Sequence, residues 1–126
     1  MKKKAVILVV EDDFLIRMDA ADIVSSAGYE AVEASSADEA VLILRSRDDI
    51  DLVFTDVVMP GTMDGLQFAF YVHQHYPKVG IIVASGTLVV DRDTLPSTAR
   101  FFVKPYSDRE IADEMANLLK TADIQR

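Results

Sequence analysis

Short apolar runs are the feature of this sequence that most limits what the chain can fold into. Residues 5–10 are all aliphatic, and a continuous run of this kind is typical of a strand buried on both faces, as in a parallel sheet. Further runs lie at 52–56, 81–85 and 101–103, with a weaker one at 29–34. Five short strands are therefore expected.

Helical patterns separate most of these runs. Gly28 stands where a helix C-terminal cap belongs, and the pairs Ser36/Glu39 and Ser107/Glu110 have the spacing of capping boxes, which open helices. Alternating strands and helices predict one α/β domain over residues 1–126, an open parallel sheet with helices on both faces. The expected inward helix faces consist of Ile16, Ala20, Ile23, Val24 and Ala27; Ala40, Val41 and Leu44; Leu66, Ala69, Phe70 and His73; and Ile111, Met115, Leu118 and Ala122.

Composition narrows the classes of partner. The formal net charge is −8, so the domain has no general attraction for nucleic acid or for an anionic membrane. The lysines at 2–4 are interpreted as a solvated flank of the first strand. No cysteine is present, which excludes disulfides, thiol catalysis and cysteine metal sites. The run at 5–10 is too short for a membrane span or a signal-peptide core. We expect a cytoplasmic protein without membrane insertion.

Polar residues come directly after the apolar runs. An acidic triplet, Glu11-Asp12-Asp13, succeeds the first run, Asp56 ends the third, and Ser85 and Lys104 come at the ends of the fourth and fifth. Because the carboxyl ends of parallel strands meet at one edge, where such sheets place their sites, these side chains should lie close together.

The acidic cluster requires a counterion. Two like charges about 4 Å apart repel by roughly 1 kcal/mol in water and about 4 kcal/mol near a protein surface. Cysteine is absent and no histidine is near the triplet in sequence, so the ligands would be oxygens only. This favours a hard cation, with Mg²⁺ first and Mn²⁺ or Ca²⁺ as substitutes; no organic cofactor is expected.

The same residues fit phosphoryl transfer. A carboxylate such as Asp56 can act as a nucleophile, and a metal neutralises the charge that develops on the phosphoryl oxygens. Lys104 would supply a fixed positive charge and Ser85 a hydroxyl donor. Pro105 comes directly after Lys104, and a cis peptide bond there would aim the lysine.

These residues also resemble the receiver domain of two-component response regulators, which has the flavodoxin-like fold of CheY. The matching motifs span nearly the whole chain: Val9-Val10-Glu11-Asp12, Asp56-Val57-Val58-Met59-Pro60, Met63-Asp64-Gly65, Ala84-Ser85-Gly86 and Lys104-Pro105. The resemblance implies a doubly wound, five-stranded parallel sheet with strand order 2-1-3-4-5.

The resemblance also implies roles at the acidic edge. Asp56 is the expected phosphoryl acceptor and metal ligand, Asp12 a direct metal ligand, and Glu11 a ligand acting through water. The backbone carbonyl of Val58 would complete the metal site. For Asp12, capping of the first helix is the alternative interpretation; Asp13 is given no metal role.

Three further residues match the switch positions of the family. Ser85 takes the place of the switch hydroxyl and Lys104 that of the family lysine. Phe101, three residues before Lys104, takes the place of the aromatic switch, with plain core packing as the alternative. Asp64 is interpreted as the cap of the third helix. His73 and His75 lie two residues apart and cannot share a helix face, so both are interpreted as structural or solvated and not as phosphorelay histidines.

Two segments depart from the family pattern. The stretch 59–64 is one residue longer than the commonest loop. The interval between Ser85 and Lys104 is short, with β-branched residues at 87–90 and Pro96 interrupting the segment after them. We therefore expect a shortened or irregular fourth helix, at most a turn or short helix at 91–95.

The function implied is that of a receiver in phosphorelay signal transduction, not of an enzyme. A sensor histidine kinase or phosphotransfer protein would donate its phosphoryl group to Asp56, which would at most lose it slowly. The phosphoprotein would then switch a surface for a downstream protein target. With no output domain within these 126 residues, output by protein contact, a phosphate-sink role, and a piece of a longer protein are all open.

Two other classes fit the sequence less well. A metal-dependent phosphohydrolase with an aspartyl-phosphate intermediate typically needs an acid/base carboxylate two residues after the nucleophile. That position holds Val58, which cannot move protons. A flavodoxin would need a hydroxyl- or glycine-rich phosphate loop after the first strand, where Glu11 and Asp12 would repel the flavin phosphate.

Overall fold

Five parallel strands form one sheet, in the order β2-β1-β3-β4-β5, which confirms the predicted topology. The computed structural model describes residues 4–57, 61, 63–86, 95, 96 and 98–125, with side chains to residue 120. Its strands are β1 (Val6–Val10), β2 (Glu30–Ala34), β3 (Ile50–Asp56), β4 (Gly80–Ser85) and β5 (Ala99–Val103). The helices are α1 (Phe14–Ser26), α2 (Ala37–Ser46), α3 (Gly65–His75) and α4 (Asp108–Gln125).

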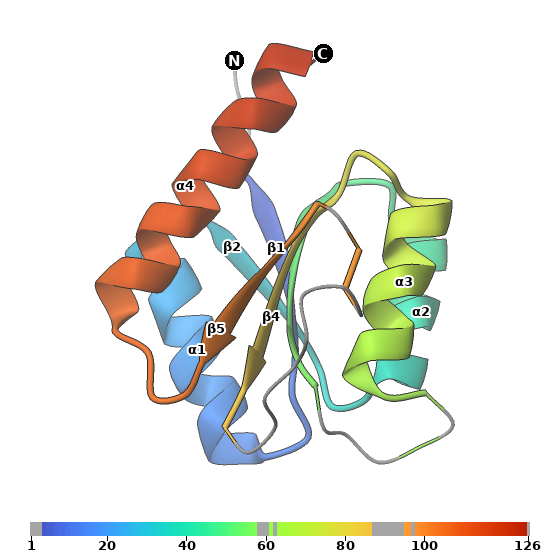
Figure 1. Cartoon of the computed structure of the whole chain (residues 1–126), viewed down its shortest axis with the longest axis horizontal. Helices are drawn as coiled ribbons and strands as arrows, with labels where there is room; N and C mark the ends of the chain where they lie inside the picture. The colour runs from blue at the N-terminus through green and yellow to red at the C-terminus, as the bar shows by residue number, and fades with distance from the viewer. Residues whose placement is uncertain (1–3, 58–60, 62, 87–94, 97, 126) are drawn as a thin grey trace.

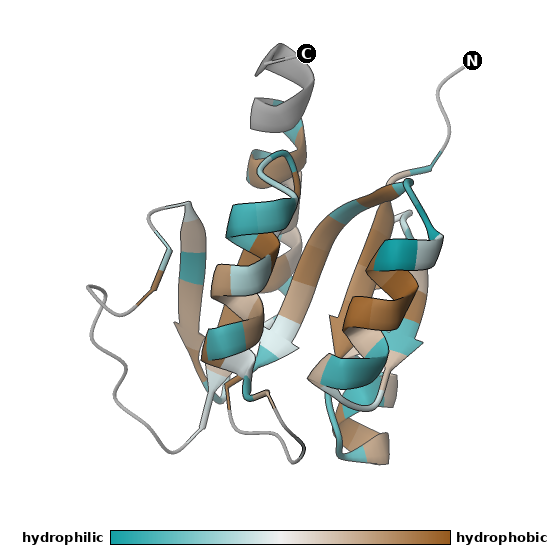
Figure 2. Cartoon of the chain, turned by 90° about the vertical axis from the view of Figure 1, so that its right-hand side faces the viewer, coloured by the Kyte–Doolittle hydropathy of each residue, from teal (hydrophilic) through white to brown (hydrophobic). Residues whose placement is uncertain are grey.

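The helices cover the sheet on both sides (Figure 1). Helices α1 and α4 lie against one face and α2 and α3 against the other. Each face has its own core, and hydrophobic residues run along the strands between them (Figure 2). Phe68 of α3 anchors the first core, while Ile111 and Met115 of α4 anchor the second.

Strand position explains why some apolar runs are stronger than others. All residues of β1 are buried, because this strand has a neighbour on each side and helices on both faces. Strands β2 and β5 lie at the edges of the sheet, and most of their residues are half-buried or exposed. The central strands are therefore unbroken apolar runs in the sequence, and the edge strands are weaker ones.

Side-chain caps open each helix. Asp13, not Asp12, caps α1, where its Oδ1 accepts from the N–H groups of Leu15 (3.0 Å) and Ile16 (3.1 Å). The interpretation of Asp12 as the cap is therefore wrong. Asp64 caps α3 as predicted, in a reciprocal box with Gln67.

The two predicted serine boxes differ in detail. Ser107 and Glu110 bond each other's backbone, at 3.1 and 3.4 Å. Ser36 accepts from the N–H of Glu39 (3.1 Å), but the Glu39 carboxylate accepts from the N–H of Ser35 (2.7 Å). The second bond is therefore displaced by one residue from the usual capping box.

Helix α3 presents a face that is shifted from the predicted one: Ala69 is buried and Leu66 contacts the core as expected, but Phe70 does not. Phe68, Ala69 and Val72 are buried, whereas Phe70 is 44% exposed. Residues 68–72 are all apolar or aromatic, so the periodicity alone does not choose between adjacent stripes. In α1, Ile16 is likewise exposed rather than inward.

Several expectations fall on residues that the structure does not describe. These are the loop residues 58–60 and 62, including Val58, and residues 87–94, which hold most of the predicted fourth helix. The described residues of that connection, 86, 95, 96 and 98, are not helical. Among the described residues, none of the helices is both long and apolar enough to span a membrane.

The cap of α1 yields a stability prediction. Replacing Asp13 with alanine removes the acceptor for two backbone N–H groups, and should lower the free energy of unfolding by about 1 kcal/mol. Urea denaturation followed by circular dichroism measures this. Asp12→Ala serves as the matched control and should not lower stability. A loss at Asp12 with none at Asp13 would contradict the assignment of the cap.

Candidate functional site

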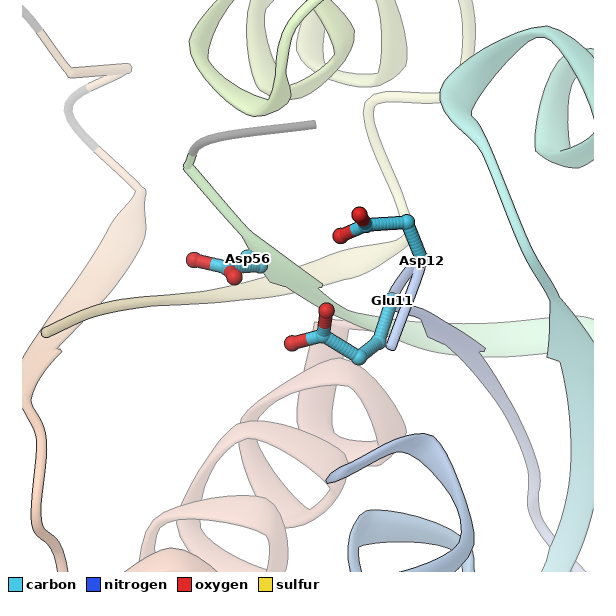
Figure 3. A group of neighbouring side chains, drawn as sticks. All are labelled: Glu11, Asp12 and Asp56. Carbon is cyan, nitrogen blue, oxygen red and sulfur yellow. The ribbon is translucent and has the colours of Figure 1, made fainter. Parts of the chain in front are cut away.

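Three carboxylates converge at the carboxyl edge of the sheet. Glu11 and Asp12 come after β1, and Asp56 ends the neighbouring strand β3. One oxygen from each lies within 4.8 Å of the others, and Glu11 and Asp12 extend toward Asp56 (Figure 3). Glu11 is buried, Asp56 half-buried and Asp12 exposed. The predicted acidic cluster is therefore assembled, and it opens to solvent at Asp12.

Lys104 reaches the cluster from the end of β5. Its Nζ lies 3.2 Å from Asp56 Oδ2 and 3.3 Å from Glu11 Oε1. The Lys104 N–H donates to the carbonyl of Ser85 (2.9 Å), and the predicted cis bond between Lys104 and Pro105 is present. The pKa of Lys104 is raised: burial would lower it, but the charges of Asp56 and Glu11 outweigh burial. The ammonium therefore stays charged between two carboxylates.

Burial and the neighbouring charged groups both change the pKa of Glu11. Burial raises the pKa of this carboxyl from 4.5 to about 7, against a lowering by the backbone hydrogen bond from Asp13, with further raising contributions from Asp12 and Asp56. Lys104 lowers the pKa but does not cancel the shift. The single lysine thus leaves excess negative charge, and protonation of Glu11 is one way to relieve it.

A bound cation is the other way to relieve the excess negative charge of the cluster. The donor set contains carboxylate oxygens only, which suits a hard divalent ion such as Mg²⁺. The exposed position of Asp12 gives such an ion access from solvent and room to keep water ligands. The residues present therefore fit the metal expected from the sequence. Val58, whose carbonyl was expected to complete the ligand set, lies outside the described residues.

Backbone groups hold the carboxylate of Asp56 on its other side. The N–H of Val57 donates to Asp56 Oδ1 (2.7 Å), and the carbonyl of Val57 accepts from the N–H of Gly65 (2.8 Å), the first residue of α3. A Cβ at Gly65 would overlap the backbone oxygen of Asp56 and lie 2.8 Å from Val57 Cα. The start of α3 thus packs directly on the peptide of Asp56.

The remaining predicted residues have different surroundings. Ser85 is buried at the end of β4, one residue beyond Ala84, the register partner of Asp56. Phe101 is half-buried on β5, opposite Val83, and packs against the core on the α2 and α3 side. Ser85 therefore lies next to the acidic edge, whereas Phe101 lies further back along its strand.

Neither histidine takes part in the acidic cluster. The ring of His75 lies 3.0 Å from the carbonyl of Tyr71, and His73 Nδ1 lies 3.3 Å from Thr98 Oγ1. These local contacts fit the structural interpretation of both residues.

Sequence reasoning missed three contributors. They are the N–H of Val57, the close approach at Gly65, and Arg17, whose guanidinium donates to the backbone of Glu11 (2.9 Å). The only sequence signal was the glycine of Met63-Asp64-Gly65. A backbone donor and a long-range arginine contact have no signature in composition or periodicity.

A hollow in the surface lies away from the acidic cluster. It has a volume of about 810 Å³ and is lined by residues at or before the starts of β3 and β4, among them Leu44, Ile50, Tyr76 and Val79. It is therefore at the opposite edge of the sheet from the carboxylates. Arg47, which also lines this hollow, is paired with Asp49 at 2.7 Å. Its charge is therefore already neutralised by a neighbouring carboxylate.

Known proteins resemble the chain over most of its length. Residues 7–116 match the family model "Response regulator receiver domain". Response regulator protein FleR of Pseudomonas aeruginosa is 34% identical over 115 residues, which cover 89% of this chain and 24% of FleR. Transcriptional regulatory protein PdtaR of Mycobacterium tuberculosis is 36% identical over 104 residues, covering 80% of this chain and 50% of PdtaR. The chain thus spans half or less of these relatives.

Solved structures agree with the family match. The receiver domain of the hybrid histidine kinase CckA superposes with a TM-score of 0.77 at 28% identity, covering 91% of this chain and 99% of that domain. A response regulator receiver protein from Sinorhizobium medicae has a TM-score of 0.89 at 23% identity, with 95% and 98% covered, and shows the shared fold.

The close approach at Gly65 can be tested by adding one methyl group. Gly65→Ala should lower the free energy of unfolding by about 1–3 kcal/mol, because the start of α3 must move off the Asp56 peptide. Urea denaturation measures the loss. Gly86→Ala is the matched control, since its Cβ would lie 3.5 Å from Lys104 side-chain atoms, an ordinary contact. Equal stabilities of the two variants would show that the packing at Gly65 is not tight.

Proposed function

We propose, from the premise that this chain belongs to the response regulator receiver domain family, that it accepts a phosphoryl group on Asp56 in phosphorelay signal transduction. One observation carries the proposal: the Lys104 ammonium bridges Asp56 and Glu11, at 3.2 and 3.3 Å, within an oxygen-only carboxylate cluster. A nucleophilic carboxylate beside a fixed cation and a hard-metal ligand set is what phosphoryl transfer to an aspartate needs.

The chemistry is a displacement at phosphorus. An oxygen of the Asp56 carboxylate forms the new O–P bond, while the N–P bond to the histidine of the donor breaks and its electron pair returns to the imidazole. Lys104, already hydrogen-bonded to Asp56 Oδ2, is placed to hold a phosphoryl oxygen as charge accumulates. The N–H of Val57, at 2.7 Å from Oδ1, orients the carboxylate.

Glu11, Asp12 and Asp56 would hold Mg²⁺, with the carbonyl of Val58 as the expected fourth protein ligand. When bound, the ion neutralises negative charge on the transferring phosphoryl group. Without it, an anionic phosphate would have to approach three carboxylates and a single lysine, and like-charge repulsion would oppose the approach.

The donor is proposed to dock on the start of α1. Phe14, Leu15 and Met18 are 61%, 65% and 43% exposed, and they lie on the helix that begins two residues after Asp12. An apolar cluster of this kind beside a reactive site is a protein contact surface rather than a solvent face. It suits a sensor histidine kinase or a phosphotransfer protein that brings its phosphohistidine to the sheet edge.

Output is proposed to arise from the added charge. A phosphoryl group brings about −1.5 to −2 charges, and among the described residues Ser85 and Lys104 are nearby polar groups that can bond it. Movement of Ser85, with Phe101 as the aromatic switch, would alter a surface for a downstream protein. The chain acts as an acceptor in the cytoplasm rather than as a turnover enzyme, since Val58 offers no acid/base group.

Phosphoryl labelling tests this function. The wild type incubated with acetyl phosphate and Mg²⁺ should gain one phosphoryl group by intact-mass spectrometry, and Asp56→Ala should gain none, because the nucleophile is gone. EDTA should abolish labelling of the wild type. Labelling of Asp56→Ala at the wild-type level would move the acceptor elsewhere, and labelling that persists in EDTA would refute the metal role.

The docking surface makes a separate prediction. Leu15→Ser should slow phosphoryl transfer from a phosphohistidine donor protein by about tenfold or more, because burial of a leucine contributes roughly 1.5–3 kcal/mol. Labelling by acetyl phosphate should not change, since that donor needs no protein contact. Leu42→Ser on α2 is the matched control, with 63% exposure against 65% for Leu15. Equal transfer rates for the two variants would exclude α1 as the docking surface.

A further inference from the structure

Arg17 contacts the backbone of the acidic turn, residues 11–13, which links β1 to α1. Its Nη1 donates to the backbone carbonyl of Glu11 (2.9 Å), and its Nε pairs with Glu33 Oε1 on β2 (3.2 Å). The guanidinium carbon also lies 5.6 Å from the centre of the Phe14 ring. The side chain is only 16% exposed, so these contacts hold a single conformation rather than a solvated one.

A positive charge is an unexpected neighbour for a cation site. Coulomb repulsion between Arg17 and a bound Mg²⁺ would weaken binding, so attraction for the metal cannot explain the arginine. The explanation must lie in the effect of its contacts on the turn. They are made to the backbone between the two carboxylates, not to the carboxylates themselves.

The contacted carbonyl belongs to the peptide that links Glu11 to Asp12. A peptide unit is planar, so fixing the direction of its oxygen also fixes the backbone from which both side chains leave. Glu11 and Asp12 are two of the three carboxylates of the cluster. One hydrogen bond from Arg17 therefore constrains two proposed ligands.

The rest of the turn is held by other groups. The N–H of Glu11 donates to the carbonyl of Ala34 (3.1 Å), the N–H of Asp13 donates to Glu11 Oε2 (3.1 Å), and the carbonyl of Asp13 accepts from the N–H of Arg17 (2.9 Å). Strand β2 thus supports the turn twice, directly through Ala34 and indirectly through Glu33 and Arg17. The Glu11 carbonyl is the point where this support depends on a long side chain.

We propose that Arg17 is a positioning residue, which fixes the peptide between Glu11 and Asp12 so that the two carboxylates stay in ligand geometry for a divalent cation. The inference rests on the proposed function, because it concerns the same metal site. Lysine cannot substitute, since a guanidinium makes two contacts from one rigid plane and an ammonium is a single point of charge.

Direct Mg²⁺ titration by isothermal calorimetry tests the role without any phosphoryl transfer. Arg17→Lys keeps the charge and should bind Mg²⁺ about tenfold more weakly, the usual scale for a residue that orients metal ligands. Arg47→Lys is the matched control: Arg47 also pairs with two carboxylates, Asp49 and Glu30, but at the opposite edge of the sheet. Its affinity should equal that of the wild type. Equal affinities of Arg17→Lys and the wild type would overturn the inference.

Arg17→Gln separates position from charge. If Arg17 acts by position, this variant also binds Mg²⁺ more weakly, whereas loss of a mere nearby charge would make binding tighter and overturn the inference. Urea denaturation of each variant verifies the folded state, and Glu33→Gln gives a milder second variant, expected to weaken binding less than Arg17→Lys does.

Asp12→Asn identifies a failure of the proposed function itself. If the wild type binds no Mg²⁺, or if its affinity for Mg²⁺ equals that of Asp12→Asn, the proposed metal site is wrong and the inference about Arg17 is wrong with it. If the wild type binds and Asp12→Asn does not, an unchanged affinity in Arg17→Lys overturns the inference alone.

Discussion

Repulsion among the carboxylates of Glu11, Asp12 and Asp56 is the constraint on which the rest of the site depends. The parallel sheet brings them together because β1 and β3 are neighbours and both end at the same edge. Lys104 carries one positive charge against three carboxylates, and burial, with smaller contributions from Asp12 and Asp56, raises the pKa of Glu11 to about 7. We propose that this excess of negative charge at an open edge favours a bound cation and, with the cation present, an incoming phosphoryl group.

The scaffold around the carboxylates is built to resist that repulsion. Val57 and Gly65 clamp the peptide of Asp56 from the α3 side, and Arg17 clamps the turn of Glu11 from the β2 side. The contacts of Gly65 and Arg17 act on backbone, whereas the N–H of Val57 bonds one carboxylate oxygen of Asp56, Oδ1, and so orients that group. In the proposed metal site, such contacts would hold three mutually repelling groups in place for the ion.

Much of this could be predicted from the sequence, for physical reasons. Burial on both faces makes the central strands unbroken apolar runs, and these runs indicated the sheet. Because the carboxyl ends of parallel strands meet at one edge, the sequence also predicted that Lys104 lies beside Asp56, 48 positions earlier in the chain. The inward face of α3 could not be predicted, because its apolar residues surround the helix and Phe68, not Phe70, faces the core. Nor could the bond from Arg17 to the Glu11 carbonyl or the overlap at Gly65, since both arise from three-dimensional proximity that no periodicity encodes.

The central claim, that Asp56 is the acceptor, has one most direct test. An acyl phosphate is reduced by borohydride to an alcohol, so treatment of the acetyl phosphate-labelled protein converts a phosphorylated aspartate to homoserine. Peptide mapping by mass spectrometry then locates that homoserine. The account predicts it at position 56, dependent on Mg²⁺. Homoserine at position 12 or 13, or none at all in a protein that carries the added phosphoryl mass, would contradict it.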